Sequence, residues 1–174
     1  MNDAIKTKVN GFISDFTGLG LPPVSVGDEA SYLDGQYSVA FNSPTLLSLR
    51  FLAEEYVTGG AHPVDYVASL NYVVSTGAVI HLADIFTSSA AALPVLRTQA
   101  QTRLTADMGD DLMWPASPPM SFFEKCWVFT SAGLEFTWNQ GEVASMAAGA
   151  VSVTITWPAL HSVVKPSGPA GEFL

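Results

Sequence analysis

The sequence predicts an α+β protein, with a mostly antiparallel sheet and an N-terminal helix and a mid-chain helix packed on it. Near the N-terminus, apolar residues recur at spacings of three and four, which is the helical period. Later segments alternate apolar and polar residues, as half-buried strands do. The connections between these segments are too short for the crossovers that parallel strands need. Because helical and strand-like segments are also segregated along the chain, an α+β class is favoured over a regularly alternating one.

Two segments carry the helical pattern. The first ends at the breaker run 18–23, and its apolar face is formed by Ile5, Val9, Phe12, Ile13 and Phe16. The second follows the capping residues 87–89 and continues to Met108-Gly109. Its apolar face is formed by Leu93, Leu96, Ala100 and Leu104.

Alternating segments predict strands in two regions of the chain. The first region is a meander of residues 37–41, 47–56, 66–74 and 79–82. The second contains residues 127–129, 134–138 and 151–157. Residues 110–120, with three prolines, predict a loop, and residues 141–149 predict a short helix that a glycine ends. Trp127, Trp138 and Trp157 fall on alternating apolar faces, which indicates core packing.

Composition and length indicate one domain, which we place at residues 1–164, followed by a flexible Pro- and Gly-rich tail at 165–174. Apolar residues make up 48% of the chain and charged residues 13%, which favours a substantial core over disorder. The net charge of −9 argues against nucleic acid and anionic lipid as partners. It suits a cationic partner, although such a charge also serves solubility alone.

Single residues exclude several kinds of site. Cys126 is the only cysteine, so neither an intrachain disulfide nor a cysteine-based zinc site can form. It lies in a strand-like apolar run, which predicts a buried and unreactive thiol. No histidine pair has metal-ligand spacing, and the aspartates around Gly109 do not match a calcium loop. The sequence therefore predicts no metal and no cofactor.

The run Tyr56-Val57-Thr58-Gly59-Gly60-Ala61-His62 is the most distinctive local feature. Two glycines can turn the backbone sharply between strands, and Pro63 favours an extended conformation at His62. Such a corner would expose His62 for binding. Alternatively, the ring nitrogens of His62 hold the corner together through backbone hydrogen bonds.

Catalytic motifs are not recognisable in the chain. A Gly-x-Ser-x-Gly elbow is absent, and Glu54 and Glu55 point to opposite faces of a strand. An esterase-like hydrolase with His62 as base stays an alternative, because catalytic triads assemble from distant residues. In the proline-rich loop, Met113 and Trp114 are the apolar pair that we expect to be partly exposed and able to contact a partner.

Three segments together resemble a bacterial extracytoplasmic family of unknown function. They are Leu47–Phe51 leading to the Thr58–His62 corner, Leu70–Val74 followed by Thr76-Gly77 and Leu82–Phe86, and Gly133–Phe136 running through Glu142–Ala144 to Trp157–Leu160. The family includes the lysozyme-sensing domain of anti-sigma-V factors and domains attached to peptidoglycan deacetylases. This chain departs from the family pattern at Gln140 and Gly141, where Pro-Tyr is typical, and at Met146, where a tyrosine is frequent.

The resemblance implies a non-catalytic binding, sensor or accessory domain of the cell envelope. Its implied partner is a cationic protein such as lysozyme, or a cell-wall component. We nominate Gly59, Gly60, His62, Met113 and Trp114 as ligand-binding residues. The resemblance implies an extracytoplasmic or secreted location, with an export signal or anchor outside this sequence. The first residues, read literally, lack the profile of a signal peptide and instead predict a cytoplasmic protein, and no segment is apolar for long enough to span a membrane.

Overall fold

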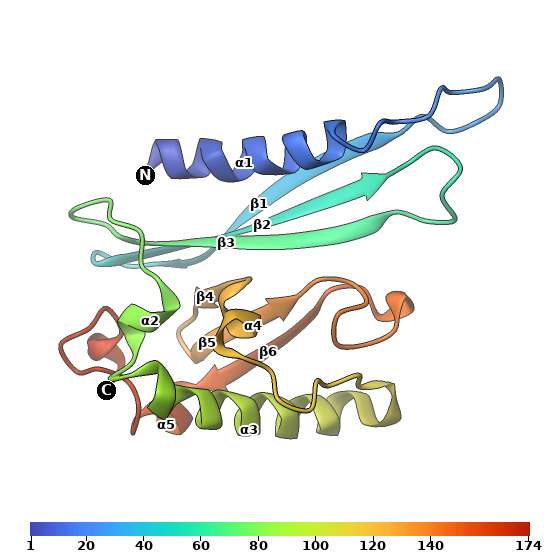
Figure 1. Cartoon of the computed structure of the whole chain (residues 1–174). Coiled ribbons are helices and arrows are strands. Elements are labelled where there is room, and N and C mark those ends of the chain that lie inside the picture. The colour runs from blue at the N-terminus through green and yellow to red at the C-terminus, as the bar shows by residue number, and fades with distance from the viewer.

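A computed structural model describes all 174 residues and shows an α+β fold with two antiparallel three-stranded sheets (Figure 1). The first sheet contains β1 (Tyr32–Asn42), β2 (Leu46–Tyr56) and β3 (Val64–Val73). The second contains β4 (Trp127–Phe129), β5 (Gly133–Trp138) and β6 (Val151–Thr156). The helices are α1 (Asn2–Thr17), α2 (Leu82–Ile85), α3 (Ser89–Met108), α4 (Met120–Glu124) and α5 (Trp157–Leu160), with 3-10 turns at Gly109–Asp111, Met146–Ala148 and Gly171–Phe173.

The predicted fold class is confirmed, and the strands divide between two sheets instead of forming one. Helix α1 lies over the outer face of the first sheet, and α3 lies under the second sheet (Figure 1). The sheets are stacked between these two helices, as Figure 1 shows. None of the helices combines the length and apolar character that crossing a bilayer requires.

The predicted strand at 79–82 is wrong. Val79 forms only an isolated bridge to Tyr72, and Leu82 begins α2. The reason is local capping, because the carboxylate of Asp84 accepts a hydrogen bond of 2.8 Å from the N–H of His81. His81 thus precedes a helix and does not continue the meander.

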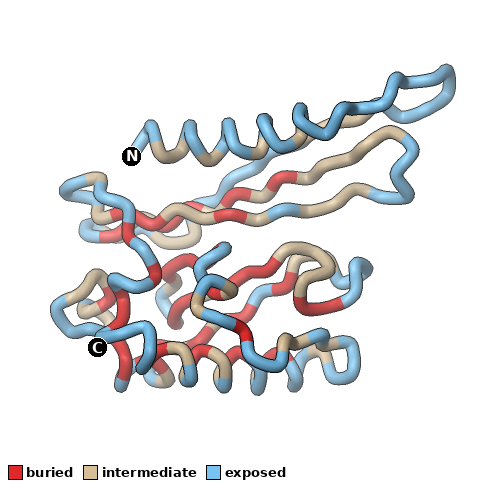
Figure 2. Tube along the Cα trace, viewed as in Figure 1, coloured by how far each residue is buried: buried red, intermediate tan, exposed pale blue.

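The main core lies between the second sheet and α3. The buried face of α3 consists of Ala92, Leu96, Ala100 and Leu104. Trp127, Trp138 and Trp157 are buried, which confirms their predicted core positions. Figure 2 shows that burial is concentrated in this half of the molecule, whereas α1 is exposed or half-buried along its whole length.

The two sheets are joined by polar side chains that satisfy the backbone of β4. Ser48 Oγ accepts a hydrogen bond from the N–H of Phe129 at 3.1 Å and donates to Asn71 Oδ1 at 2.6 Å. Asn71 Nδ2 donates to the carbonyl of Trp127 at 2.9 Å. Ser48 and Asn71 are both buried, so this network gives the sheet contact a specific register. Arg50 and Glu135 form an ion pair across the same contact.

The C-terminal residues pack against the core. Ala170 is buried, and the ring of Phe173 stacks on Trp157 with 4.1 Å between ring centroids. Thr45 also donates a hydrogen bond of 2.7 Å to the Glu172 carboxylate. The flexibility that the sequence predicts for 165–174 would require the release of these contacts.

Candidate functional site

The glycine corner at 58–62 connects β2 to β3 as a tight turn. Gly59 has a φ of 86°, which glycine adopts without steric cost. The N–H of Gly60 donates to the carbonyl of Val57 at 2.8 Å, and a Cβ on Gly60 would lie only 2.9 Å from that oxygen. Thr58 fixes the corner to the chain before β1, because its N–H donates to Ser31 Oγ at 2.9 Å. Both glycines are therefore required by the backbone itself.

His62 is exposed on this corner, and one of its ring nitrogens is engaged. Its Nδ1 lies 2.8 Å from the carbonyl oxygen of Pro63. Because a carbonyl can only accept, Nδ1 carries the proton of this hydrogen bond. In the neutral ring, Nε2 is then an unprotonated acceptor that is free to meet a ligand.

A surface pocket of about 470 Å³ brings the corner together with a second loop. One side is formed by His62 and Pro63, and the other side by Gln140, Met146, Ala147 and Gly149. The second loop contains the 3-10 turn Met146–Ala148. The turn ends at Gly149 as predicted, but the short helix that the sequence predicts over residues 141–149 is reduced to these three residues. The pocket therefore joins two motifs that are almost 80 positions apart in the sequence.

Two side-chain amides fix this loop to the edge of β3. Asn139 Oδ1 accepts from the N–H of Val67 at 2.8 Å, and Gln140 Oε1 accepts from the N–H of Asp65 at 3.1 Å. Gln140 Nε2 also donates to the carbonyl of Met146 at 2.6 Å, which holds the turn closed. Gln140 thus uses both ends of its amide, one toward the strand and one toward the pocket wall.

Three carboxylates form a row across the first sheet beside this pocket. Asp34 lies directly opposite Glu54, and Glu54 lies directly opposite Asp65. Side chains at opposed positions share one face of a sheet and lie about 5 Å apart at Cβ, so like charges there are destabilising. Tyr32 donates to Glu54 at 2.8 Å, and this hydrogen bond raises the pKa of Tyr32 to about 12.

The row is not a metal site in this structure. No group of three or more His, Cys, Asp or Glu side chains in the described chain is arranged to hold a metal ion. Asp34 is exposed, and Glu54 and Asp65 are half-buried. We name Asp34, Glu54 and Asp65 the acidic row.

Met113 and Trp114 lie apart from the His62 pocket. Met113 is 52% exposed, and its N–H donates to the carbonyl of Val143 at 2.8 Å. Trp114 is half-buried, with its ring edge-on to Phe122 and Trp138 at centroid distances of 5.5 and 5.6 Å. Neither residue lines the pocket that His62 lines. Whether these residues, Gly59, Gly60 and His62 bind a ligand stays a prediction.

Gln140 and Met146 are site residues that the sequence alone does not nominate. The sequence did contain a signal for them, because both are positions where the chain departs from the pattern of the family that it resembles. The acidic row has a weaker signal, because Asp34, Glu54 and Asp65 become neighbours only through the register of three strands.

Residues 83–158 match the sequence model of a family described as "Protein of unknown function (DUF3298)". No curated protein sequence matches the chain. The matched range covers the second sheet, α3 and α4, and leaves α1 and the first sheet outside it.

Two solved structures share the fold. A DUF3298 family protein from Pseudomonas aeruginosa is 18% identical with a TM-score of 0.62, covering 78% of this chain. This chain spans 63% of the length of that protein. A member of the same family from Bacteroides fragilis is 19% identical with a TM-score of 0.63, covering 99% of this chain and 72% of the other. The chain thus combines a sequence match to DUF3298 over residues 83–158 with the fold of solved DUF3298 proteins over most of its length.

Proposed function

We propose that this chain is a non-catalytic binding or sensor domain of the bacterial cell envelope, located outside the cytoplasm. Its proposed ligand is a cationic protein such as lysozyme, or a cell-wall component. The sequence resemblance to lysozyme-sensing and deacetylase-attached domains supports the location and the ligand class.

The acidic row beside the His62 pocket is the observation that carries this proposal. Three opposed carboxylates on neighbouring strands cost stability, and no Lys or Arg side chain forms an ion pair with them. A basic partner would relieve that repulsion on binding. The pocket next to Asp65 offers a concave surface of about 470 Å³ for a side chain of the partner.

Calorimetric titration with a basic lysozyme tests this proposal. We expect saturable binding at low salt that persists, with lower affinity, at physiological salt. The double variant Glu54→Gln with Asp65→Asn should weaken binding about tenfold or more, because two desolvated charge contacts are lost. Glutamine at 54 can still accept the hydrogen bond from Tyr32.

A charge-matched control distinguishes recognition at the acidic row from the long-range attraction that the net negative charge produces. Asp107→Asn with Asp110→Asn removes the same charge at the exposed end of α3. If both double variants weaken binding equally, only net charge is at work and the acidic row is not the site. Binding that disappears at physiological salt would contradict the proposal in the same way.

The hydrolase alternative rests on the free Nε2 of His62, which could act as a general base. The pocket that His62 lines contains no serine, threonine or cysteine, so a nucleophile would have to be water. Turnover of simple ester substrates that His62→Ala abolishes, in a protein that still folds, would favour this alternative over a binding domain.

A further inference from the structure

The two edges of the first sheet differ in how their backbone groups are satisfied. The sheet order β1-β2-β3 leaves β1 and β3 at the edges. On β3, the side chains of Asn139 and Gln140 accept the outward N–H groups of Val67 and Asp65. On β1, none of the hydrogen bonds in the structure reaches outward from residues 34–39. All six of these residues are exposed, so β1 presents an open edge.

The open edge of β1 lacks the features that prevent pairing between chains. Natural edge strands are protected by lysine, proline, inward charges or bulges. Residues 34–39 contain no lysine and no proline, and Asp34 is their only charged residue. The bulge in β1 occurs after Val39, beyond the exposed segment. An edge of this kind is a template for an additional strand.

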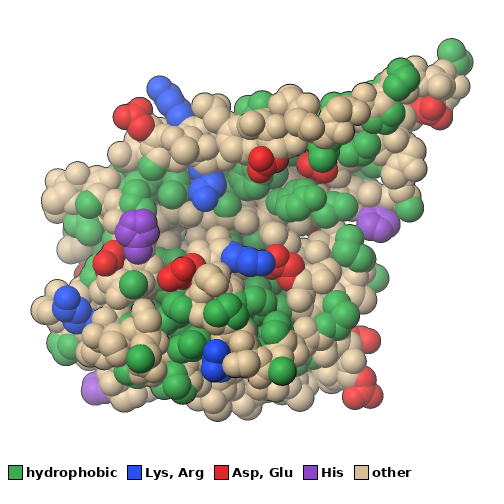
Figure 3. Space-filling view, viewed as in Figure 1, with side chains coloured by type: hydrophobic (Ala, Val, Ile, Leu, Met, Phe, Trp, Pro, Cys, Tyr) green, Lys and Arg blue, Asp and Glu red, His purple; other side chains and the backbone are tan.

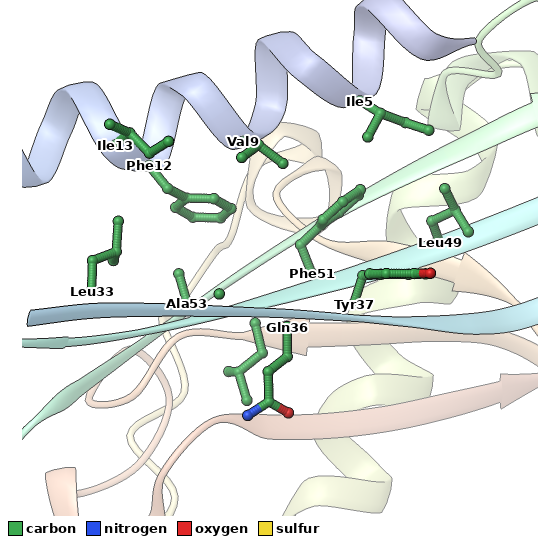
Figure 4. Close-up of a pocket in the computed structure, with 12 residues that line it drawn as sticks. Ile5, Val9, Phe12, Ile13, Leu33, Gln36, Tyr37, Leu49, Phe51 and Ala53 are labelled. Carbon is green, nitrogen blue, oxygen red and sulfur yellow. The ribbon is translucent and has the colours of Figure 1, made fainter.

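An apolar groove runs beside this edge, between α1 and the first sheet. Figure 4 shows Ile5, Val9 and Phe12 of α1 pointing toward the sheet, with Phe51 pointing back toward the helix and the ring of Tyr37 lying along the sheet. The groove has a volume of about 670 Å³, and ten of its twelve lining residues are hydrophobic. On the opposite, β3 side of the first sheet, the space-filling view also shows hydrophobic side chains between α1 and the sheet (Figure 3).

The groove is open on the β1 side because α1 covers the sheet incompletely. Val9 and Ile13 remain 40% and 48% exposed, and Tyr37 and Val39 remain 72% and 54% exposed. Two residues with small side chains, Gly35 and Ala53, lie opposite each other on β1 and β2 and form part of the floor of the groove. No residue of α1 is fully buried, so the helix lacks the cover that an amphipathic helix normally finds.

We propose that β1 pairs antiparallel with β1 of a second copy of this chain, forming a two-fold dimer with a continuous six-stranded sheet. A dyad perpendicular to the sheet keeps α1 of both copies on the same side. The exposed apolar side chains of the β1 edge, Tyr37 and Val39, then lie next to the dyad and lose solvent contact.

The sequence of β1 is self-complementary in this arrangement. A register centred on Tyr37 places it opposite Tyr37 of the second copy, and places Gly35 opposite Val39. Asp34 then faces Ala40, so no like charges are opposed across the dyad. A small molecule could fill the groove but could not satisfy the row of backbone groups, which only another strand matches.

Salt dependence distinguishes this dimer from the proposed binding of a cationic partner. Two chains of charge −9 repel each other, so salt should strengthen the dimer by screening. Binding of a cationic protein should instead weaken with salt. The salt dependence of dimerisation can be measured on the full chain alone by sedimentation velocity. The measurements run from low micromolar to millimolar protein concentration, at low and at high salt.

Two lysine substitutions test the interface. Tyr37→Lys and Val39→Lys should each weaken dimerisation about tenfold or more, because each introduces a charge next to its symmetry mate or into an apolar contact. Both positions are exposed in the single chain, so folding should persist, and far-UV circular dichroism checks this. Tyr66→Lys on β3, a position on the same face at the other edge, is the matched control and should leave the dimer intact.

Disulfide trapping tests the register. Tyr37→Cys should cross-link two copies on mild oxidation, since opposed residues in antiparallel strands have the Cα separation that a disulfide needs. Cys126 is buried and does not compete. If Gln36→Cys cross-links and Tyr37→Cys does not, the dyad passes through residue 36 instead of 37, and the β1 interface is retained. Tyr66→Cys is the control and should not cross-link.

Several outcomes would overturn the dimer. The proposal fails if the chain stays monomeric up to millimolar concentration at both low and high salt concentration. It also fails if a dimer forms and the two lysine substitutions leave its dissociation constant unchanged. Cross-linking no faster at positions 36 and 37 than at 66 would also exclude β1 pairing. A monomer whose binding of an apolar dye is abolished by Gly35→Leu would assign the groove to a small hydrophobic ligand.

Discussion

At the scale of single residues, the burial of Cys126 can be predicted from the sequence and checked in the structure. Its apolar neighbours predict a buried, unreactive thiol, and the structure confirms burial with 2% exposure. Desolvation raises the pKa of the thiol to about 11, and hydrogen bonds with Ser69 and Thr137 only partly offset this.

For His62, the sequence leaves two roles open: the ring could bind a ligand, or it could hold the glycine corner together. In the structure, Nδ1 is hydrogen-bonded to the carbonyl of Pro63 and Nε2 stays accessible, which is compatible with both roles.

The raised pKa of Cys126 predicts a pH dependence of stability. The unfolded thiol ionises near pH 9 and the folded thiol near pH 11, so the thiol contributes its full stability below pH 9. As pH rises from 9 to 10, we expect the free energy of unfolding to fall by about 1 kcal/mol, because the unfolded chain releases the proton at a lower pH than the folded chain. Denaturant titrations at closely spaced pH values measure this.

Cys126→Ala provides the control for that pH dependence. The variant should lose about 1 kcal/mol of the fall between pH 9 and 10. A smaller fall should remain, because unfolded tyrosines begin to ionise in this range while the pKa of folded Tyr32 is raised to about 12. An unchanged slope in Cys126→Ala would show that another group causes the effect.

At the scale of elements, periodicity located most helices and strands and missed those that local hydrogen bonds decide. The alternation at 79–82 looks like a strand, but the Asp84 cap converts the segment into α2. The spacing of apolar residues located α1 correctly, yet it could not show that the helix would leave a groove above the sheet. Periodicity reports which face of an element is apolar and does not report how completely another element covers it.

The amide clamp on β3 predicts the stability cost of losing one side chain. Asn139→Ala removes the acceptor for the N–H of Val67 and should lower the free energy of unfolding by about 1–2 kcal/mol. Urea denaturation measures this. Gln36→Ala is the control, because that side chain is exposed and reaches only Asp34, at 3.5 Å, so its effect should stay within about 0.5 kcal/mol. Equal effects of the two substitutions would mean that the clamp contributes nothing measurable.

At the scale of the whole molecule, the two sheets share one buried polar joint. Ser48 and Asn71 come from the first sheet and satisfy the edge of β4 in the second. Separation of the two halves would exchange these buried hydrogen bonds for bonds to water, so the joint favours the packed state and couples the two halves. The single domain at residues 1–164 stays a prediction from composition and length, and this joint is the physical reason to expect it.

Cooperative unfolding tests the single domain. All four tryptophans lie between residues 114 and 157, so their fluorescence reports the second half, whereas far-UV circular dichroism reports both halves. We expect the two signals to change at the same urea concentration, as a two-state transition requires. A circular dichroism change at lower urea, before the fluorescence change, would show that α1 and the first sheet unfold separately.

The sequence by itself determined the fold class, most of the elements, the buried tryptophans and the inert cysteine, because these follow from local period and apolarity. Only the tertiary structure brought His62 next to Gln140 and Met146, aligned Asp34, Glu54 and Asp65 in one row, and left β1 open while β3 was clamped. These features depend on strand register and on contacts between segments far apart in the chain. A local pattern cannot specify them, because the same alternation is compatible with several registers and several packing partners.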